Sequence, residues 1–345
     1  MNNKVLISSY NVFDVLAHIP KGIESKYSLT VNTKYYSFNL CENPAFILKH
    51  PELDFFYICC ESIFGGKIGT FSYKDNELKE VSYVDSCGKS SCYLTFDDNN
   101  ENIININYWN STISIHPVKN GILLDAIYVY SSGEKQVATN IEEHLSNRHS
   151  EPHFHSAVFH NNILYVADLG KDRLHLFTYK NNEIKFIRFE QLTKNNGPRY
   201  LRILNNQLYI INEISSTVEL FSINKDNTFT FKQTISTIPD DYNGVNTCGN
   251  IMIHPNNKLI YVSNRGHDSI AVYKINDSTY LELVNIYSSN GKTPRHFNFN
   301  NDGTLLYVAN QDSNNVSLFK INTNDGTLEQ DRIIECNSPN FIIVF

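Results

Sequence analysis

Several residue types and patterns are scarce in this chain of 345 residues, and each scarcity excludes a class of protein. There is one tryptophan, whereas WD-type repeat proteins normally carry one in each repeat, so that class is disfavoured. The net charge is −7 and no run of lysine or arginine stands out, so the basic footprint of a nucleic-acid-binding protein is missing. No apolar stretch is long enough to span a bilayer, and we expect no membrane partner.

The cysteine pattern and the N-terminus bear on the cellular compartment. The chain contains no C-x-x-C pair, and several cysteines lie inside apolar strand patterns, which is typical of buried, reduced thiols in a cytosolic protein. The cysteines are Cys41, Cys59, Cys60, Cys87, Cys92, Cys248 and Cys336. Ser8 and Ser9 cut short the apolar segment that begins at Val5, so no signal peptide is recognisable. We therefore expect a cytoplasmic protein whose cysteines are reduced.

What is present is a strand pattern that recurs about every 50 residues. It is clearest in residues 259–265 (LIYVSNR) and 305–311 (LLYVANQ), and each of these is followed by a second apolar strand. A repeat of this length built from short strands indicates a β-propeller. Each repeat packs mainly on its neighbours, so a long chain can form one domain, and we expect a single domain over residues 1–345.

Two markers divide the repeats into blades. The first is a turn followed by a strand that usually starts with proline, which is tolerated there because no N–H is needed. The second is a strand centred on tyrosine or an equivalent residue, and turn signals separate the two markers. The seven centres are Leu6, Tyr57, Asn105, Tyr165, Tyr209, Tyr261 and Tyr307. The pattern predicts an all-β fold, a seven-bladed β-propeller with four antiparallel strands in each blade.

The phase of the repeats predicts how the propeller closes. The chain begins on the second marker and ends on the first, so residues 5–7 lack a preceding partner strand and residues 341–344 lack a following one. Pairing the N- and C-terminal strands closes the ring and removes two exposed edges. We therefore predict that one blade is built from both termini.

Charged residues gather at one end of the predicted hairpins. Alignment on the proline gives a first set: Ala45, Cys92, His153, Arg199, Gly249, Arg295 and Asn340. Counting four residues past each centre gives a second set: Tyr10, Glu61, Trp109, Leu169, Glu213, Arg265 and Gln311. Charges at inner strand ends are costly unless they are paired or solvated, so these sets indicate either a salt-bridged channel lining or a ligand site.

The sequence His153-Phe154-His155 places two imidazoles on one side of a strand. Two histidines alone do not make a metal site, and no third ligand stands at a telling spacing, so we expect no metal. A histidine that titrates near neutral pH is suited to act as a general acid or base. The sequence does not decide between His153 and His155 for that role.

Seven segments together are similar to motifs of the propeller-type lactonase family. The resemblance is carried by residues 153–156 (HFHS), 165–173 (YVADLGKDR), 197–200 (GPRY), 212–218 (NEISSTV), 261–270 (YVSNRGHDSI), 294–295 (PR) and 309–313 (ANQDS). The first five resemble the family's H-x-H-S, D-L-G-x-D, G-P-R-H, N-E-L-S-S-x-V and Y-V-S-N-R-G-x-D-S-I motifs. The match is densest between His153 and Glu329.

The resemblance implies chemistry at a lactone ring. The family includes bacterial-type 6-phosphogluconolactonases, which open such a ring, and fungal carboxymuconate cyclases, which close one. It therefore implies a lactone hydrolase without a cofactor that acts on a small anionic lactone or carboxylate. The first substrate to expect is 6-phosphogluconolactone, which would place the enzyme in carbohydrate metabolism and the pentose phosphate pathway.

The resemblance also implies roles for individual residues. The histidine, two arginines and glutamate of the cyclase branch correspond to His153, Arg199, Arg265 and Glu213. The two arginines would hold an anionic group or a developing oxyanion, because guanidinium binds such groups bidentately. His153 would be the general base on water and Glu213 would position it or move a proton. Further substrate contacts are expected from His155, Arg295, Glu61 and Gln311.

Two departures from the family leave alternatives open. Tyr200 stands where the G-P-R-H motif ends in histidine, and Tyr93 stands where an early blade usually has one. A carboxymuconate-type cyclase using the same residues and a non-catalytic propeller that binds a protein or ligand remain alternatives. The sequence also leaves the oligomeric state open.

Overall fold

The structure is a computed structural model and describes residues 4–10, 28–31, 34–37, 41, 43–75, 77–134 and 151–345. The chain divides into unit 1, Met1–Ser9 with Pro198–Phe345, and unit 2, Tyr10–Gly197. Its regular structure within the described residues is all β, as predicted. In that part of the chain no helix is long and apolar enough to cross a membrane.

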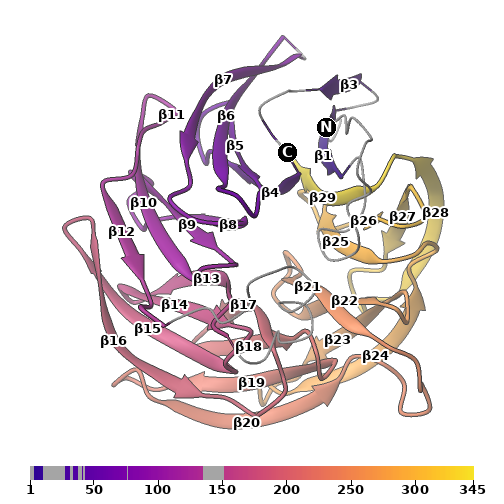
Figure 1. Cartoon of the computed structure of the whole chain (residues 1–345). Coiled ribbons are helices and arrows are strands. Elements are labelled where there is room, and N and C mark those ends of the chain that lie inside the picture. Colours follow the sequence, from indigo (N-terminus) through magenta and orange to yellow (C-terminus); the bar gives the residue numbers. More distant parts are fainter. Residues whose placement is uncertain are drawn as a thin grey trace. The chain divides into compact units, whose positions relative to one another are not determined.

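Unit 1 contains three complete antiparallel sheets of four strands each, in sequence order (Figure 1). The first comprises β17 (Pro198–Leu204), β18 (Gln207–Asn212), β19 (Thr217–Ile223) and β20 (Phe229–Ser236). The second comprises β21 (Thr247–Ile253), β22 (Leu259–Arg265), β23 (Ser269–Ile275) and β24 (Leu281–Ser288). The third comprises β25 (Pro294–Phe299), β26 (Leu305–Asn310), β27 (Asn315–Ile321) and β28 (Leu328–Glu335). Each is the antiparallel meander of a propeller blade.

Unit 2 also contains three complete sheets, together with the short hairpin of β2 (Ser28–Val31) and β3 (Lys34–Ser37). The first sheet comprises β4 (Pro44–Lys49), β5 (Phe55–Cys60), β6 (Lys67–Lys74) and β7 (Glu77–Asp85). The second comprises β8 (Ser91–Phe96), β9 (Asn102–Asn107), β10 (Thr112–Lys119), β11 (Ile122–Leu123) and β12 (Tyr128–Ser131). The third comprises β13 (Phe154–His160), β14 (Ile163–Asp168), β15 (Arg173–Lys180) and β16 (Glu183–Gln191). The β-propeller class with antiparallel strands is thus as predicted, and the number of blades stays a prediction.

The prediction of four strands in every blade is wrong for the second sheet of unit 2. Its outer strand is split into β11 and β12, which both pair with β10. Asn120 and Gly121 have φ values of 52° and 81°, so they form a tight two-residue hairpin that returns the chain at once along β10. The chain then leaves the sheet and rejoins it as β12, so two short strands take the place of one.

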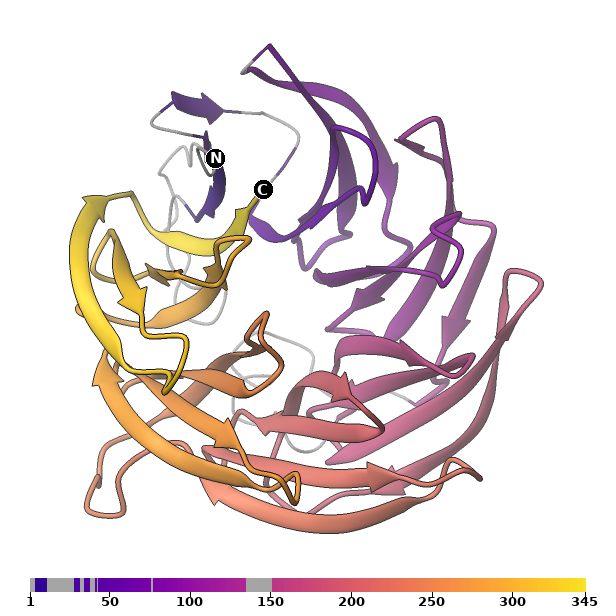
Figure 2. The ribbon, with the colours of Figure 1, turned by 180° about the vertical axis from the view of Figure 1, so that it is seen from behind.

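The predicted pairing of the two terminal strands is confirmed within unit 1. β1 (Val5–Ser9) pairs antiparallel with β29 (Pro339–Val344), with Val5 opposite Val344 and Ser8 opposite Phe341. Figures 1 and 2 show the two strands side by side, in indigo and yellow. Ile7 and Ile342 pack in one buried cluster with residues of β26 and β27. The first strand of the chain is therefore held by the last.

Deleting residues 341–345 is expected to unfold the protein rather than to shorten a tail. The deletion removes the buried side chains of Phe341, Ile342 and Val344 and the partner strand of β1. Each buried apolar side chain contributes about 2–5 kcal/mol, so the loss is comparable to the whole stability of a typical protein. Thermal unfolding of the soluble fraction measures this, with a chain lacking only Phe345 as the control. A melting temperature within a few degrees of the control would contradict the prediction.

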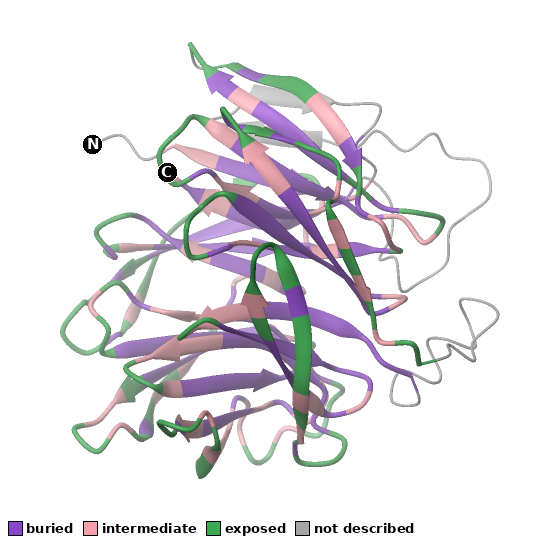
Figure 3. Cartoon of the chain, turned by 90° about the vertical axis from the view of Figure 1, so that its left-hand side faces the viewer, coloured by how far each residue is buried: buried purple, intermediate pink, exposed green. Residues whose placement is uncertain are grey.

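The tyrosines at the strand centres explain the spacing of the repeats. Tyr57 and Tyr261 are fully buried, and their hydroxyls donate to the carbonyl oxygens of Gly121 (2.9 Å) and Gly326 (3.1 Å). A buried tyrosine supplies a large apolar ring and still satisfies its hydroxyl. Figure 3 shows the buried residues along the inner strands and the exposed ones at the turns and outer edges.

The asparagine of the Tyr-Val-x-Asn repeats ties one sheet to the segment that leaves the preceding one. Asn264 and Asn310 donate from Nδ2 to the carbonyl oxygens of Thr237 (2.7 Å) and Ser289 (3.2 Å). Each acceptor follows the outer strand of the preceding sheet. A buried carbonyl is satisfied in this way, so these asparagines have a structural role.

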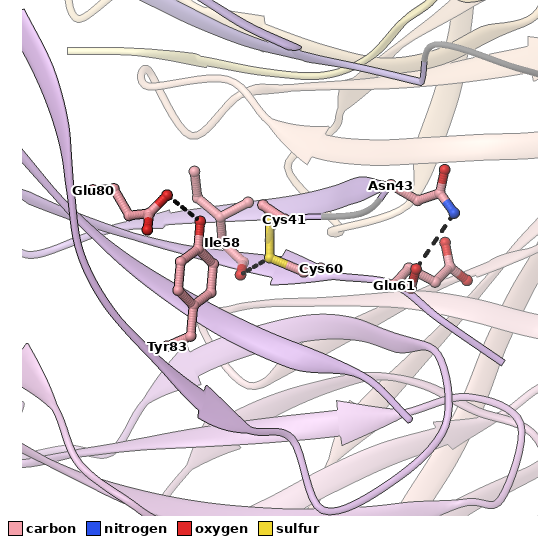
Figure 4. Close-up of a disulfide and its surroundings, with 7 residues drawn as sticks. All are labelled: Cys41, Asn43, Ile58, Cys60, Glu61, Glu80 and Tyr83. Atoms are coloured by element: carbon pink, nitrogen blue, oxygen red, sulfur yellow. Dashed lines mark hydrogen bonds between the residues drawn. A yellow bond between two sulfur atoms is a disulfide. The ribbon is translucent and has the colours of Figure 1, made fainter. Parts of the chain in front are cut away.

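The expectation that all cysteines are reduced is wrong for one pair. Cys60 ends β5 at the position that Asn264 and Asn310 hold in their sheets, and it forms a disulfide with Cys41 (Figure 4). The two Cα atoms are 4.8 Å apart and the residues are 19 positions apart. No sequence spacing marks the pair, because only the folded strand end brings it together. Cys59, Cys87, Cys92, Cys248 and Cys336 are outside disulfides.

Reduction of the Cys41–Cys60 disulfide is expected to lower the free energy of unfolding by about 2–4 kcal/mol, because the cross-link reduces the number of conformations that the unfolded chain can adopt. Urea unfolding with and without dithiothreitol measures the difference. The Cys60→Ser protein is the matched control and should not respond to the reductant. Equal midpoints for the oxidised and reduced wild-type protein would refute the expectation.

Candidate functional site

A β-bulge opens the first strand of each sheet. In unit 1 the register shifts between Pro198 and Tyr200 and between Pro294 and His296, which leaves Arg199 and Arg295 as the extra residues. Bulges re-aim the side chain of the extra residue and are frequent beside functional sites. The bulge therefore explains why charged residues stand at these positions without disturbing the ladder.

The register corrects the sequence alignment at two positions in unit 2. In β13 the shift falls between Phe154 and Ser156, so the counterpart of Arg199 is His155 and not His153. The proline of this repeat lies three residues before the bulge instead of one, which misled the alignment. In β9 the residue that follows the strand end Asn107 is Tyr108, so Trp109 was placed one position too far.

Three of the predicted residues meet in unit 1. Glu213 follows β18 and is 1% exposed. Its Oε2 atom accepts from Nη1 of Arg199, which lies on β17, and is 3.1 Å from Nη2 of Arg265, the last residue of β22. One buried carboxylate is thus shared by two guanidinium groups. Since buried charges are costly unless paired, the pairing holds all three side chains in one arrangement.

The backbone of β21 fixes both guanidinium groups further. Arg199 donates from Nε to the carbonyl oxygen of Gly249 (2.7 Å), and Arg265 donates from Nη2 to that of Cys248 (2.8 Å). A Cβ atom on Gly249 would lie 2.8 Å and 2.9 Å from the backbone carbonyl oxygens of Arg295 and Pro294, so only glycine fits at this bulge. The two arginines are therefore preorganised before any ligand binds.

The other two predicted residues of unit 1 lie on the β25 sheet. Arg295 is the half-buried bulge residue of β25. Gln311 follows β26 at the position that Glu213 has after β18, is 2% exposed, and donates from Nε2 to Oδ1 of Asp312 (3.3 Å). The β25 sheet thus repeats the arginine of the β17 sheet but has an amide where that sheet has a carboxylate.

His296 is a functional candidate that the sequence analysis did not single out. It follows Arg295, is 6% exposed, and stacks on Phe341 with ring centroids 3.7 Å apart. Burial lowers the pKa of His296 well below its ordinary value, and the positive charges of Arg202, Arg199 and Arg295 lower it further. His296 is therefore neutral at physiological pH. Its place beside an arginine was visible in the sequence, but its burial was not.

The two predicted histidines of unit 2 both contact Tyr108. His153 is fully buried, stacks on the Tyr108 ring at 4.6 Å, and has Nδ1 3.4 Å from the carbonyl oxygen of Tyr108. A carbonyl can only accept, so Nδ1 carries the proton and Nε2 has the lone pair. His155 packs against the same ring edge-on at 5.6 Å.

Asp168 fixes the backbone of this histidine segment. Its Oδ1 atom accepts from the backbone N–H of His153 (2.8 Å), and its Oδ2 atom is 3.2 Å from Nε2 of His175. Asp168 ends β14 at the position where Asn212 ends β18. A carboxylate and a histidine thus hold the start of β13 in place.

Glu61 lies in unit 2 directly after Cys60 (Figure 4). It is 8% exposed, and its Oε2 atom accepts from the hydroxyl of Tyr10 (2.9 Å). The described residues of both units contain no group of three or more His, Cys, Asp or Glu side chains that could hold a metal ion.

The fold is an antiparallel β-propeller, and its strand ends carry a buried cluster of charged side chains. The chain belongs to the family described as "Lactonase, 7-bladed beta-propeller", whose model matches residues 23–344. A relative from Lactococcus lactis, an uncharacterized protein, is 28% identical over 314 residues, which cover 87% of this chain and 86% of the relative.

Solved structures show the same fold at low sequence identity. A periplasmic gluconolactonase from Pseudomonas aeruginosa is 19% identical with a TM-score of 0.83, and the match covers 99% of this chain and 98% of that protein. A protein from Bacteroides fragilis described as a candidate 6-phosphogluconolactonase is 22% identical with a TM-score of 0.81, covering 99% and 98%. These two likenesses bear on the fold alone.

Proposed function

We propose that this protein is a lactone hydrolase that opens a sugar-type lactone, with 6-phosphogluconolactone as the first substrate to test, and that it has seven blades. Membership of the lactonase family supports the reaction class. The observation that carries the proposal is the buried cluster of Arg199, Glu213 and Arg265. Such a cluster offers two fixed positive groups to an oxygen that becomes negative.

The two arginines would stabilise the transition state of hydrolysis. Water adds to the lactone carbonyl, the carbonyl oxygen becomes an oxyanion, and the ring C–O bond then breaks to give a carboxylate and a hydroxyl. Donors fixed in a site poor in water stabilise such an oxyanion by about 3–4 kcal/mol each. Glu213 would hold Arg199 and Arg265 in position, because it accepts from both.

His153 is proposed as the general base that takes a proton from the attacking water. With its Nδ1–H directed to the Tyr108 carbonyl, the neutral imidazole carries its lone pair on Nε2, which is the atom that would take the proton. The same proton would pass to the leaving alkoxide of the opened ring. His155, Glu61, Arg295 and Gln311 are proposed to contact the substrate.

The contact between Tyr200 and Arg199 explains why a tyrosine can stand where the family motif has histidine. It is 5% exposed, and the guanidinium carbon of Arg199 lies 5.3 Å from the centroid of its ring. A cation over an aromatic face is stabilised by the ring quadrupole. The tyrosine therefore supports Arg199, and we propose that the enzyme remains active with this departure from the motif.

A panel of substrates tests the proposal. Freshly generated 6-phosphogluconolactone and unphosphorylated gluconolactone are followed by proton release, with spontaneous hydrolysis subtracted. Carboxymuconate is followed by proton uptake, because ring closure adds a carboxylate oxygen and a proton across its C=C bond. Turnover of either sugar lactone supports the proposal. Turnover of carboxymuconate alone identifies a cyclase, and turnover of none of the three supports the non-catalytic alternative; both outcomes reject the proposal.

A further inference from the structure

Asp168 holds a place where most of the other complete sheets have asparagine. In each of these sheets one residue of the second strand pairs with the residue just before the bulge of the first strand. Asparagine holds this place in four sheets, as Asn107, Asn212, Asn264 and Asn310. All four donate from Nδ2, three of them to a backbone carbonyl oxygen. A carboxylate cannot donate, so the aspartate has a different role from these asparagines.

The carboxylate of Asp168 is fully buried and accepts from three donors of unit 2. Its Oδ1 atom accepts from the backbone N–H groups of His153 (2.8 Å) and Lys171 (3.2 Å), and its Oδ2 atom is 3.2 Å from Nε2 of His175. A carboxylate only accepts, so the ring proton of His175 is on Nε2. The buried Nδ1 atom of His175 has no partner within the described part of the chain. The one proton of the neutral His175 ring is therefore donated to Asp168.

The bond to the backbone of His153 brings a negative charge beside the residue that is proposed as the general base. His153 becomes an imidazolium when it takes a proton from water, and a nearby negative charge stabilises that form. Burial strengthens the attraction, because little water screens it. Asparagine could accept from the same two backbone N–H groups through its side-chain oxygen, but it carries no charge. The charge is therefore what aspartate adds at this place.

Other titratable groups also surround His153. Tyr108, which follows β9, stacks on its imidazole with ring centroids 4.6 Å apart, and His155 on β13 contacts the same tyrosine ring. Glu151 lies two residues before His153 and is 1% exposed, and Lys171 follows β14 and is half-buried. These groups stay in place when the aspartate alone is replaced, so a single substitution measures its contribution.

We propose that Asp168 is a positioning residue for the general base: it fixes the backbone of His153 and stabilises the imidazolium, while His175 holds the carboxylate. This inference rests on the proposed function, because it extends the role of His153 as the base. The positive charge forms beside Asp168 when His153 takes the proton of the attacking water, and it disappears when the proton passes to the leaving alkoxide. Asp168 therefore acts on the chemical step and not on substrate binding.

Asp168→Asn tests the assignment, because it removes the charge and keeps the shape of the side chain. The variant should fold with a melting temperature within a few degrees of the wild type, since asparagine stands at this place in four other sheets. For a lactone that is hydrolysed, kcat should fall by about 3–10-fold and KM should stay within about twofold. The acid limb of the pH–rate profile should move to lower pH by roughly half a unit or more, because a less basic imidazole is protonated only at lower pH.

Histidine NMR measures the same coupling without turnover. The titration midpoint of His153, assigned with the His153→Gln protein, should shift to lower pH in Asp168→Asn and stay unchanged in Asp97→Asn. Asp97 is the matched control, because it is a buried carboxylate of the same unit that also accepts from backbone N–H groups. Its carboxylate accepts from Tyr179 near one end of β15, whereas Asp168 pairs with the other end.

An unchanged His153 midpoint in Asp168→Asn overturns the assignment even where lactones are hydrolysed. A variant that fails to fold also overturns it, because the carboxylate would then be needed for the fold itself. A lactone panel without turnover rejects the hydrolase alone, and a shifted midpoint would still support the coupling of Asp168 to His153.

Discussion

A protein in which alanine replaces Glu213 is expected to lose lactone hydrolysis and a large part of its stability. The side chains of Arg199 and Arg265 are 6% and 9% exposed, so removal of the carboxylate leaves two buried guanidinium groups that repel each other. Removing one partner from a buried ion pair costs about 3–5 kcal/mol. The arginines would also move from the positions that hold the oxyanion, and we expect hydrolysis to fall at least about 100-fold.

Urea unfolding and the hydrolysis rate measure the two effects separately. Glu190→Ala is the matched control, because Glu190 pairs with Arg188 at the surface and is 37% exposed. Exposed ion pairs contribute little to stability, so the free energy of unfolding of the control should lie within about 1 kcal/mol of the wild-type value. A Glu213→Ala protein as stable as this control and equally active would show that the cluster is dispensable.

The second large effect is expected from His153→Gln, which should lower kcat by about 10²–10⁴-fold. Glutamine is chosen because His153 is fully buried, and alanine would add a cavity to the loss of the base. The wild-type rate should fall at low pH as the base becomes protonated. The variant should lack this dependence, so the pH–rate profile separates a lost base from a disturbed structure.

Two histidine variants serve as references for this prediction. His160→Gln changes a half-buried histidine at the other end of β13 and should keep the wild-type profile. His155→Gln should weaken substrate binding and keep the pH dependence. If the dependence disappears in His155→Gln and persists in His153→Gln, the base is His155.

The sequence predicted the strands and the pairing of the chain ends, because both follow from a periodic pattern. Tyr57 and Tyr261 mark strand centres since each buries its ring and satisfies its hydroxyl within the fold. The strands at residues 5–7 and 341–344 could be paired from phase alone, although their register could not. These features depend on local spacing, which a repeat makes visible.

The features that the sequence missed depend on tertiary contacts. Cys41 and Cys60 meet only because a strand end reaches the segment before β4. The bulge of β13 lies at His155, two positions after the residue that the alignment selected, and no sequence pattern shows which of the two histidines is the extra residue. The positive φ values at Asn120 and Gly121 split an outer strand that the repeat pattern treats as continuous.

In the candidate site, too, some residues could be predicted from the repeats and others could not. Arg199, Glu213 and Arg265 were named from their places in the repeats, and the structure brings their charged atoms into contact. His296 was missed, because a buried neutral histidine becomes visible only when the neighbouring strands are in place. Equivalent repeat positions thus predict which charges gather, and packing decides which of them are paired.

The measurement that tests the central claim most directly is the hydrolysis of 6-phosphogluconolactone by the wild-type protein and by Arg265→Ala. Proton release is followed after subtraction of the spontaneous rate, with Arg332→Gln as the control for a lost surface charge. We predict turnover by the wild type and the control, and a loss of at least about 100-fold in Arg265→Ala. Equal turnover by Arg265→Ala and the control would contradict the assignment of the arginine–glutamate cluster to the reaction.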